Sequence, residues 1–429
     1  MTEAAPKTPQ VSGRAYLKLI GLGALIGIPA ALLAAVFLAL IHELEDLLWH
    51  DLPDALGYDT PPWYLVLLLP VVGAALVLAA RRLLPGNGGH RPVDGFGASA
   101  PTPVAYVPGV ALAAIGSLAF GAVLGPEAPL IALGSAVGLA VTHFVDVDPA
   151  HHRILAMAGA FSAISALFGG PIAAGILLIE AGIGLGNLLI PLLIPGLVAA
   201  AIGFLIFTGF GDWGGLEQST LSVPGLPPYE EVHFGDLLVA VVAGVLIALV
   251  IRASFALARR VAAGEDHAGM GTLLLAGGLA VGLIAVVADA LGSSYDAVLF
   301  SGQAAIPDLV TETSASVLAV VLVAKLLAYA ICLGCGFRGG QVFPAIFLGI
   351  AVVMFAVIAF DVSPTLAVAA GTAAGCAAAT RLLFASVVIG SILVGSAGAD
   401  AVPAAILAGV AAWVTGTALE RAPGRRTAE

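Results

Sequence analysis

Apolar stretches long enough to cross a lipid bilayer recur along this chain. Three of them cover about residues 16–41, 62–80 and 236–258. A helix needs about 20 apolar residues to span the hydrocarbon core of a bilayer. Hydrophobic residues make up 60% of the 429 positions and charged residues only 10%, which excludes an ordinary soluble domain. The sequence therefore predicts an all-α membrane protein that crosses the bilayer many times.

The distribution of charge predicts how these spans are oriented. Lys and Arg gather on the cytoplasmic side of membrane proteins. Basic residues lie at 7–18, 81–82, 259–260 and 421–426, and acidic residues lie at 43–59 and 217–236. This pattern predicts a multi-pass protein of the cell membrane with both termini in the cytoplasm. The first half opens with an outward span and the second half with an inward one, which is typical of an inverted repeat.

A short internal match supports the repeat. Residues 125–134 and 340–349 share the pattern G-x3-P-x4-G, 215 positions apart (344 minus 129). Each copy joins a glycine-rich loop to an apolar helix. We expect the small-residue pairs 158–159 and 370–371 to open two further helices. Inverted repeats with interrupted helices place opposed helix ends near the middle of the membrane, where positive ends bind anions.

These features predict one transport domain between two short tails. The cytoplasmic N-terminal tail covers 1–15, the transmembrane domain 16–418, and the cytoplasmic C-terminal tail 419–429. Within the domain, the repeats cover about 16–210 and 235–418. Several apolar segments are too short or too rich in Pro and Gly for simple spans. We therefore expect tilted, broken helices whose loops line a pathway.

A single carboxylate, Glu127, stands in the first copy of the repeated pattern between Pro126 and Pro129. A charged side chain at membrane depth costs roughly 2.5–3.5 kcal/mol or more, so such a residue is a functional candidate. The two prolines interrupt an arriving helix and suit the first turn of a new one. Glu127 would then face the free N–H groups of a helix start, where the dipole is positive. Two interpretations follow: a cap that only satisfies backbone donors, or a carboxylate that a mobile anion replaces.

Composition narrows the range of partners. The net charge is −11 and no basic cluster of useful size exists, so we expect no nucleic-acid partner. Cys332, Cys335 and Cys376 cannot form a disulfide framework, and the single C-x-x-C spacing lies at an apolar helix end. We interpret these cysteines as small packing residues. Neither a cofactor nor a metal is expected.

Several motifs occur together in a recognisable order. The strongest block runs over 121–180 and includes Leu124-Gly-Pro-Glu-Ala-Pro129 and the small-residue stretch 158–180. The second half adds Lys325, the stretch 339–344 and the pair 380–381. Over nearly its whole length the chain resembles the CLC chloride channels and anion/proton exchangers.

The resemblance implies a CLC-like fold: an inverted-topology repeat, a homodimer with one pore per subunit, and permeation of an inorganic anion, chloride first, across the bilayer. Glu127 would be the gate, because its carboxylate mimics an anion when ionised and leaves the site when protonated or displaced. The implied anion-binding positions are Gly97, Ala98, Ser99, Gly125, Ala128, Gly340, Gln341, Val342 and Phe343.

The chain departs from the family pattern at both anion motifs. In the first, Ala98 stands at the serine position and Ser99 comes one place late. Ser99 could still supply a hydroxyl, or backbone N–H groups could serve alone. In the second, Gln341, Val342 and Phe343 replace the usual order. The Gln341 amide could face an anion or pack as a polar side chain.

Further departures bear on proton coupling. Family exchangers carry a second Glu directly after the one that matches Glu180, and here that place is Ala181. Glu180 itself is interpreted as structural. The family's pore tyrosine has no counterpart, since no Tyr follows Tyr329. These differences favour a passive channel, with a proton-coupled chloride antiporter as the alternative.

A remote alternative is an intramembrane aspartyl protease. Residues 209–212 fit the pattern G-x-G-D, and Tyr295-Asp296 fits its partner motif. Two facing aspartates that share a proton would be the chemistry required. However, the two motifs come in reversed order, and chance matches are expected in a chain with 54 glycines. We therefore expect a transporter and not an enzyme.

Overall fold

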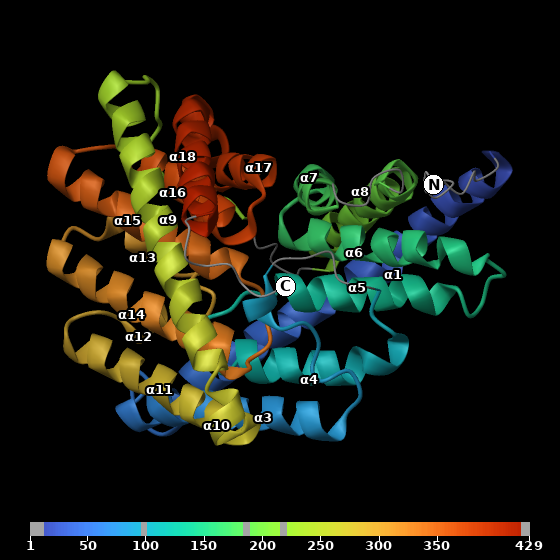
Figure 1. The fold of residues 1–429 in the computed structure, drawn as a ribbon, viewed down its shortest axis with the longest axis horizontal. Coiled ribbons are helices and arrows are strands. Elements are labelled where there is room, and N and C mark those ends of the chain that lie inside the picture. The colour runs from blue at the N-terminus through green and yellow to red at the C-terminus, as the bar shows by residue number, and fades with distance from the viewer. Residues whose placement is uncertain (1–12, 96–100, 183–188, 215–220, 422–429) are drawn as a thin grey trace. The chain divides into compact units, whose positions relative to one another are not determined.

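The computed structural model describes residues 13–95, 101–182, 189–214 and 221–421 (Figure 1). These residues form helices joined by loops, and no strand occurs among them beyond one isolated two-residue bridge. The helices are α1 (Gly13–Asp46), α2 (Leu52–Ala55), α3 (Trp63–Leu83), α4 (Val107–Leu118), α5 (Glu127–Val141), α6 (His152–Leu167), α7 (Pro171–Ala181), α8 (Leu189–Gly214), α9 (Phe234–Ala262), α10 (Glu265–Ala268), α11 (Met270–Ala290), α12 (Tyr295–Val298), α13 (Ile306–Thr311), α14 (Ala315–Cys335), α15 (Val342–Phe360), α16 (Pro364–Thr380), α17 (Leu383–Val394) and α18 (Val402–Arg421).

The helices agree with the predicted membrane protein. Among the described residues, eight helical stretches are long and apolar enough to cross a bilayer. The predicted spans at about 16–41, 62–80 and 236–258 correspond to α1, α3 and α9. Helices α5, α7 and α16 are apolar but only 11–17 residues long. At 1.5 Å per residue they are shorter than the hydrocarbon core of about 30 Å. The described part of the chain therefore combines full spans with the predicted short, broken helices.

The chain forms two compact units. The first contains residues 1–37, 97–107 and 130–219, and the second contains 38–96, 108–129 and 220–429. In the first unit α6 contacts both α7 and α8 (Figure 1). Every residue of α6 from Ile154 to Leu167 is buried, and these residues are apolar or small. The hydroxyl of Ser162 on α6 donates a hydrogen bond of 2.7 Å to the Gly27 carbonyl oxygen of α1.

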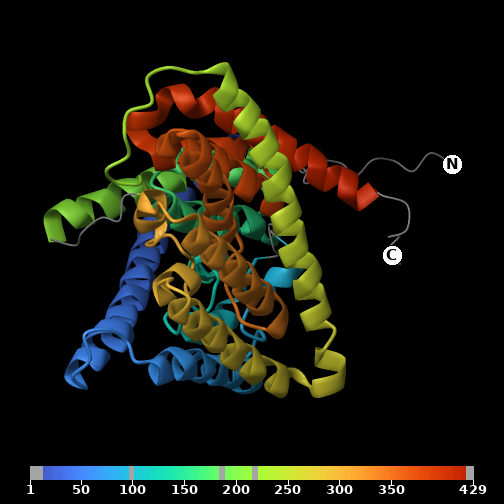
Figure 2. The same cartoon turned by 90° about the vertical axis from the view of Figure 1, so that its left-hand side faces the viewer.

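The second unit is built around two buried helices. Helix α11 contacts both α3 and α14, and α15 contacts α14 and α16. Helix α9 crosses this group and contacts α14, α15, α16 and α18, as the two views show (Figures 1 and 2). Nearly all of α16 and the first two thirds of α15 are buried. The N-terminal end of α15 therefore lies inside the protein.

Glycines allow matching helix crossings in the two halves of the chain. In the first unit Gly134 of α5 lies against the backbone of Gly159 of α6, and in the second Gly349 of α15 lies against that of Gly371 of α16. A Cβ added at any of these four glycines would overlap backbone atoms of the facing helix. One expectation was wrong: the pairs 158–159 and 370–371 lie in the middle of α6 and α16 and do not open them. The helices start earlier, near Pro149 and at Pro364, because proline suits a first helical turn.

Candidate functional site: a carboxylate between two helix starts

Two loops from the two repeats pair with each other inside the second unit. The Gly125 N–H donates to the Gly340 carbonyl oxygen at 2.9 Å, and the Gly340 N–H donates to the Gly125 carbonyl oxygen at 2.5 Å. Each glycine is followed two residues later by a helix start, α5 at Glu127 and α15 at Val342. The two copies of the repeated sequence pattern therefore contact each other through their first glycines.

The Glu127 side chain lies at this junction and is fully buried, with 0% exposure. Its Oε1 accepts a hydrogen bond of 3.0 Å from the backbone N–H of Phe343 in the first turn of α15. The backbone N–H groups of Val342 and of Glu127 itself also face the carboxylate. Its Oε2 is buried without a hydrogen-bond donor. One carboxylate oxygen is thus solvated by a helix start, and the other is not.

Backbone dipoles, and not a cation, offset the charge of Glu127. Within the described residues, none of the ion pairs includes Glu127. The first N–H groups of a helix have no partner within the helix, and the dipole there amounts to roughly +0.5 charge. Such an end binds any small anion in the same way as a carboxylate. The geometry can therefore hold either Glu127 or a mobile anion at the start of α15.

The paired glycines leave room for the carboxylate. A Cβ on Gly340 would overlap Oε2 of Glu127, and a Cβ on Gly125 would meet both carboxylate oxygens. Both glycines are buried. Side chains at these two positions would fill the space that the carboxylate occupies. The glycines of the G-x3-P pattern therefore leave room for the carboxylate, and the helix starts that follow them supply backbone donors.

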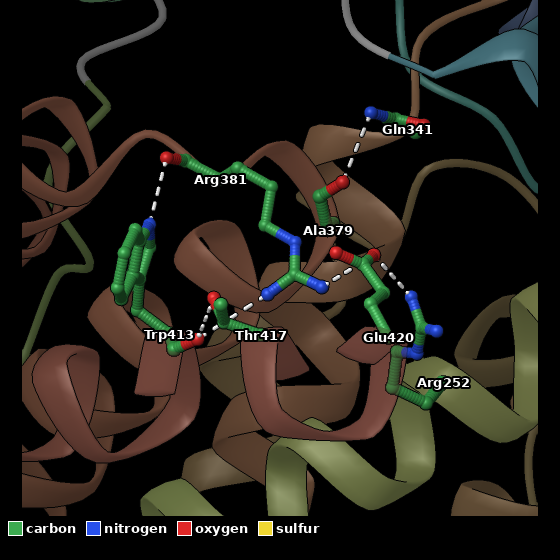
Figure 3. A network of polar contacts seen from close by, with 7 residues as sticks. All are labelled: Arg252, Gln341, Ala379, Arg381, Trp413, Thr417 and Glu420. Carbon is green, nitrogen blue, oxygen red and sulfur yellow. Dashed lines mark hydrogen bonds and ion pairs between the residues drawn. The ribbon is translucent and has the colours of Figure 1, made fainter. Parts of the chain in front are cut away.

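Gln341 packs through its amide nitrogen. Its Nε2 donates a 3.2 Å hydrogen bond to the Ala379 carbonyl oxygen at the end of α16 (Figure 3). Its own carbonyl oxygen accepts a 2.9 Å hydrogen bond from the hydroxyl of Tyr329 on α14. The side-chain oxygen of Gln341 is buried without a partner. The donor that the sequence offered to an anion is therefore used in packing against α16.

Arg381 holds the end of α16 that receives Gln341. Its Nη1 donates to the Trp413 carbonyl oxygen at 3.3 Å, and the Trp413 indole N–H donates back to the Arg381 carbonyl oxygen at 3.2 Å. Glu420 lies 2.6 Å from both Arg381 and Arg252 of α9, and Figure 3 shows this chain of contacts. The network joins α16, α18 and α9 beside the start of α15. The family-like pair 380–381 thus has a positioning role in the structure.

Lys325 and Trp49 hold the loop that leads to Glu127. The Lys325 ammonium is buried and donates to the carbonyl oxygens of Leu299 at 2.6 Å and Phe300 at 3.2 Å. The Phe300 N–H in turn donates to the Gly121 carbonyl oxygen at 3.4 Å. The indole N–H of buried Trp49 donates to the Ala119 carbonyl oxygen at 3.0 Å. These bonds satisfy non-helical backbone at depth, as a membrane interior requires.

The structure brings together six of the nine predicted anion-binding positions and the predicted gate. Gly125, Ala128, Gly340, Gln341, Val342 and Phe343 lie in the two paired loops and the first turns of α5 and α15. Gly97, Ala98 and Ser99 lie outside the described residues, so the first anion motif stays a prediction. Sequence reasoning missed Tyr329 as a partner of Gln341, and the only available signal was a polar aromatic residue within an apolar helix.

Residues that suggested other chemistry form no second reactive site among the described residues. Cys332 and Cys335 are buried free thiols, and Cys332 Sγ accepts a hydrogen bond from the Val123 N–H. Among the described residues, no group of His, Cys, Asp and Glu could hold a metal ion. Asp296 lies on the short helix α12. The side chain of Asp212 lies outside the described residues.

Comparison with known proteins identifies the family. A family model described as voltage gated chloride channel matches residues 87–416, which include both paired loops. The chain belongs to this family. Members of the family are transporters and not enzymes, so the protease alternative is excluded.

Relatives and solved structures agree with this membership. The YfeO protein of Escherichia fergusonii, named as an ion-transport protein, is 32% identical over 336 residues, which are 76% of each chain. A YfeO protein of Escherichia coli is 31% identical over the same share. The fold is similar to a slow cyanobacterial Cl⁻/H⁺ antiporter, with a TM-score of 0.75 and 19% identity over 95% of this chain and 96% of that one. It is also similar to a CLC-type fluoride/proton antiporter, with a TM-score of 0.72 and 20% identity over 94% and 96%.

Proposed function

We propose that the chain carries an inorganic monovalent anion, chloride first, across the cell membrane and that Glu127 is the gate. The observation that supports this most is the buried Glu127 carboxylate, which lies at the start of α15 with only one oxygen hydrogen-bonded. An anion of similar charge could take the same N–H groups when the carboxylate leaves. Gating follows from this competition, because both ligands need the same donors.

We further propose a passive channel as the first mechanism. Ala181 stands where family exchangers carry their second glutamate, so the usual inner proton acceptor is missing from the sequence. A proton-coupled antiporter is the second candidate. The Oε2 atom of Glu127 accepts no hydrogen bond, so it could take a proton, which favours the antiporter. Two structures of similar fold are also described as proton antiporters.

Flux from liposomes tests both mechanisms. Purified protein in chloride-loaded liposomes should release chloride when valinomycin lets potassium balance the charge. A passive channel would move no protons, whereas an antiporter would move them in a fixed ratio to chloride, which a pH electrode in the same vessel measures. Bromide, nitrate and fluoride in parallel would rank the anions. Liposomes that release none of these anions would refute the proposed function.

We also propose a homodimer with one pore in each chain, on the basis of the family resemblance. Light scattering of the detergent-solubilised protein should give a protein mass of twice the 42.7 kDa of one chain. A single-chain mass that persists after reconstitution would refute the dimer.

A further inference from the structure

A second cluster of charge lies next to the site, around a tight loop after α3. Gly86, Asn87, Gly88 and Gly89 all have positive φ angles, from 50° to 91°. This run turns the Asn87 carbonyl oxygen towards Arg338, which donates to it from Nε at 3.2 Å and from Nη2 at 2.9 Å. Asn87 thus positions the Arg338 guanidinium.

Asn87 also holds a second arginine. Its Oδ1 accepts a 3.0 Å hydrogen bond from Nε of Arg81 on α3. A Cβ added at Gly88 would come within 3.4 Å of the side chains of both Arg81 and Arg338, so the loop is packed between them. The two guanidinium groups are therefore fixed on either side of one short loop.

The Arg338 side chain is buried and incompletely satisfied. The residue is 2% exposed, and its backbone N–H donates to the Ser117 hydroxyl at 2.9 Å. Its Nη1 is buried without a hydrogen-bond partner. Guanidinium is always charged and cannot escape burial by losing a proton. A buried charged group with an unsatisfied donor is costly, and an anion at Nη1 would supply the acceptor that this nitrogen lacks.

The surrounding charges favour an anion of charge −1. Arg81 and Arg91 lie 3.6 Å and 3.5 Å from the Glu265 carboxylate. Both guanidinium groups share this one carboxylate, and none of the ion pairs among the described residues includes Arg338. The positive charge of Arg338 therefore has no ion-pair partner within this group.

The cluster reaches from the surface into the protein. The side chains of Arg91 and Glu265 are 38% and 30% exposed, whereas Arg81 is 4% exposed. Arg338 is buried deeper and stands two residues before Gly340, which faces the Glu127 carboxylate. The guanidinium groups thus range from partly exposed Arg91 to buried Arg81 and Arg338.

We propose that Arg338, with Arg81 and Arg91, forms a second binding site for a monovalent inorganic anion, at Nη1 of Arg338. Anion binding at this site requires only the cluster. The further inference that an anion binds here before it reaches Glu127 rests on the proposed function. The site recognises charge and small size.

Substitution of Arg338 tests the proposal against a neighbouring arginine. Arg338→Met should raise the chloride KM for flux about tenfold, and Arg338→Lys should restore it to within about threefold of the wild type. Arg82→Met is the matched control, because Arg82 is exposed at the end of α3 and lies outside the cluster. Bromide soaked into crystals of the full chain should give anomalous density beside Nη1 of Arg338. Equal KM values for Arg338→Met and Arg82→Met, or no bromide at Nη1, would overturn the site.

A gain of affinity separates anion binding from a purely structural role. Glu265→Gln removes the carboxylate that Arg81 and Arg91 share, so the chloride KM should fall about threefold. A misfolded variant cannot produce this result, and an unchanged or higher KM would overturn the proposal. If the wild type carries no anion but bromide lies at Nη1, the second site stands and the proposed function fails.

Discussion

Glu127 shows how a membrane interior can hold an acid without a paired cation. The Phe343 N–H and the other donors at the start of α15 supply the positive potential, and Gly340 leaves the space. The same arrangement makes the residue replaceable, because its interactions are those that any small anion can make. Its role in transport can therefore be tested by removing the charge and keeping the shape.

Glu127→Gln should remove most of the pH dependence of anion flux. In the wild type, protonation at low pH neutralises the carboxylate and weakens its hold on the helix start, so flux should rise as pH falls. Glutamine is neutral at every pH, so flux should be high and flat. Chloride release from liposomes between pH 4 and pH 8 measures this, with the exposed Glu43→Gln as control. An unchanged pH profile would contradict the gating role.

At the scale of helices, the close crossings of α5 with α6 and of α15 with α16 stabilise the fold. Gly134 in the third turn of α5 contacts the backbone of α6, and Gly349 in the third turn of α15 contacts the backbone of α16. These contacts lie seven residues beyond Glu127 and Val342, the first residues of the two helices. Within the second unit, the Gly349 crossing therefore positions the start of α15.

Gly134→Ala and Gly349→Ala should each destabilise the protein by about 1–3 kcal/mol, the usual effect of overpacking a tight contact. In both variants the new Cβ overlaps a backbone oxygen of the facing helix. Thermal unfolding in detergent measures the loss. Gly21→Ala and Gly235→Ala are matched controls, since a Cβ at either position meets nothing within 4 Å. Equal melting temperatures for the two pairs would contradict the crossing.

At the scale of the whole molecule, the charges at the ends of the spans predict the orientation in the membrane. Arg81 and Arg82 end α3, and Arg259 and Arg260 lie in the last turn of α9. The acidic residues between α1 and α3 lie at the opposite end of α3 from its arginines. By the positive-inside rule, we propose that the arginines lie on the cytoplasmic side.

Cysteine labelling in intact cells should read out this orientation. Asp54→Cys should react with a membrane-impermeant maleimide, and Ala268→Cys should react only after the cells are opened. Both positions are exposed, and the three native cysteines are buried, so background labelling should be small. The reverse labelling pattern would show that the charge rule fails for this chain.

Much of the fold and the central residue of the site could be predicted from local sequence signals. The length of an apolar run predicts a span, because the bilayer thickness is constant. Proline predicts a helix start, because its ring sets φ and removes a donor that is unused there. Glu127 could be singled out because an acid in apolar surroundings needs a special environment. The pairs 158–159 and 370–371 were wrongly predicted to open helices, because small residues also occur where two helices cross closely.

Only the tertiary structure decided how distant segments meet. Nothing local in the sequence shows that Gly125 pairs with Gly340, that the Gln341 amide turns to Ala379, or that Asn87 holds Arg338. These contacts join segments from 38 to 251 residues apart. Their formation depends on how whole helices pack. The sequence by itself determined which segments are helical and which residue needs solvation by backbone dipoles. The packing of the helices determined that the start of α15 provides this solvation.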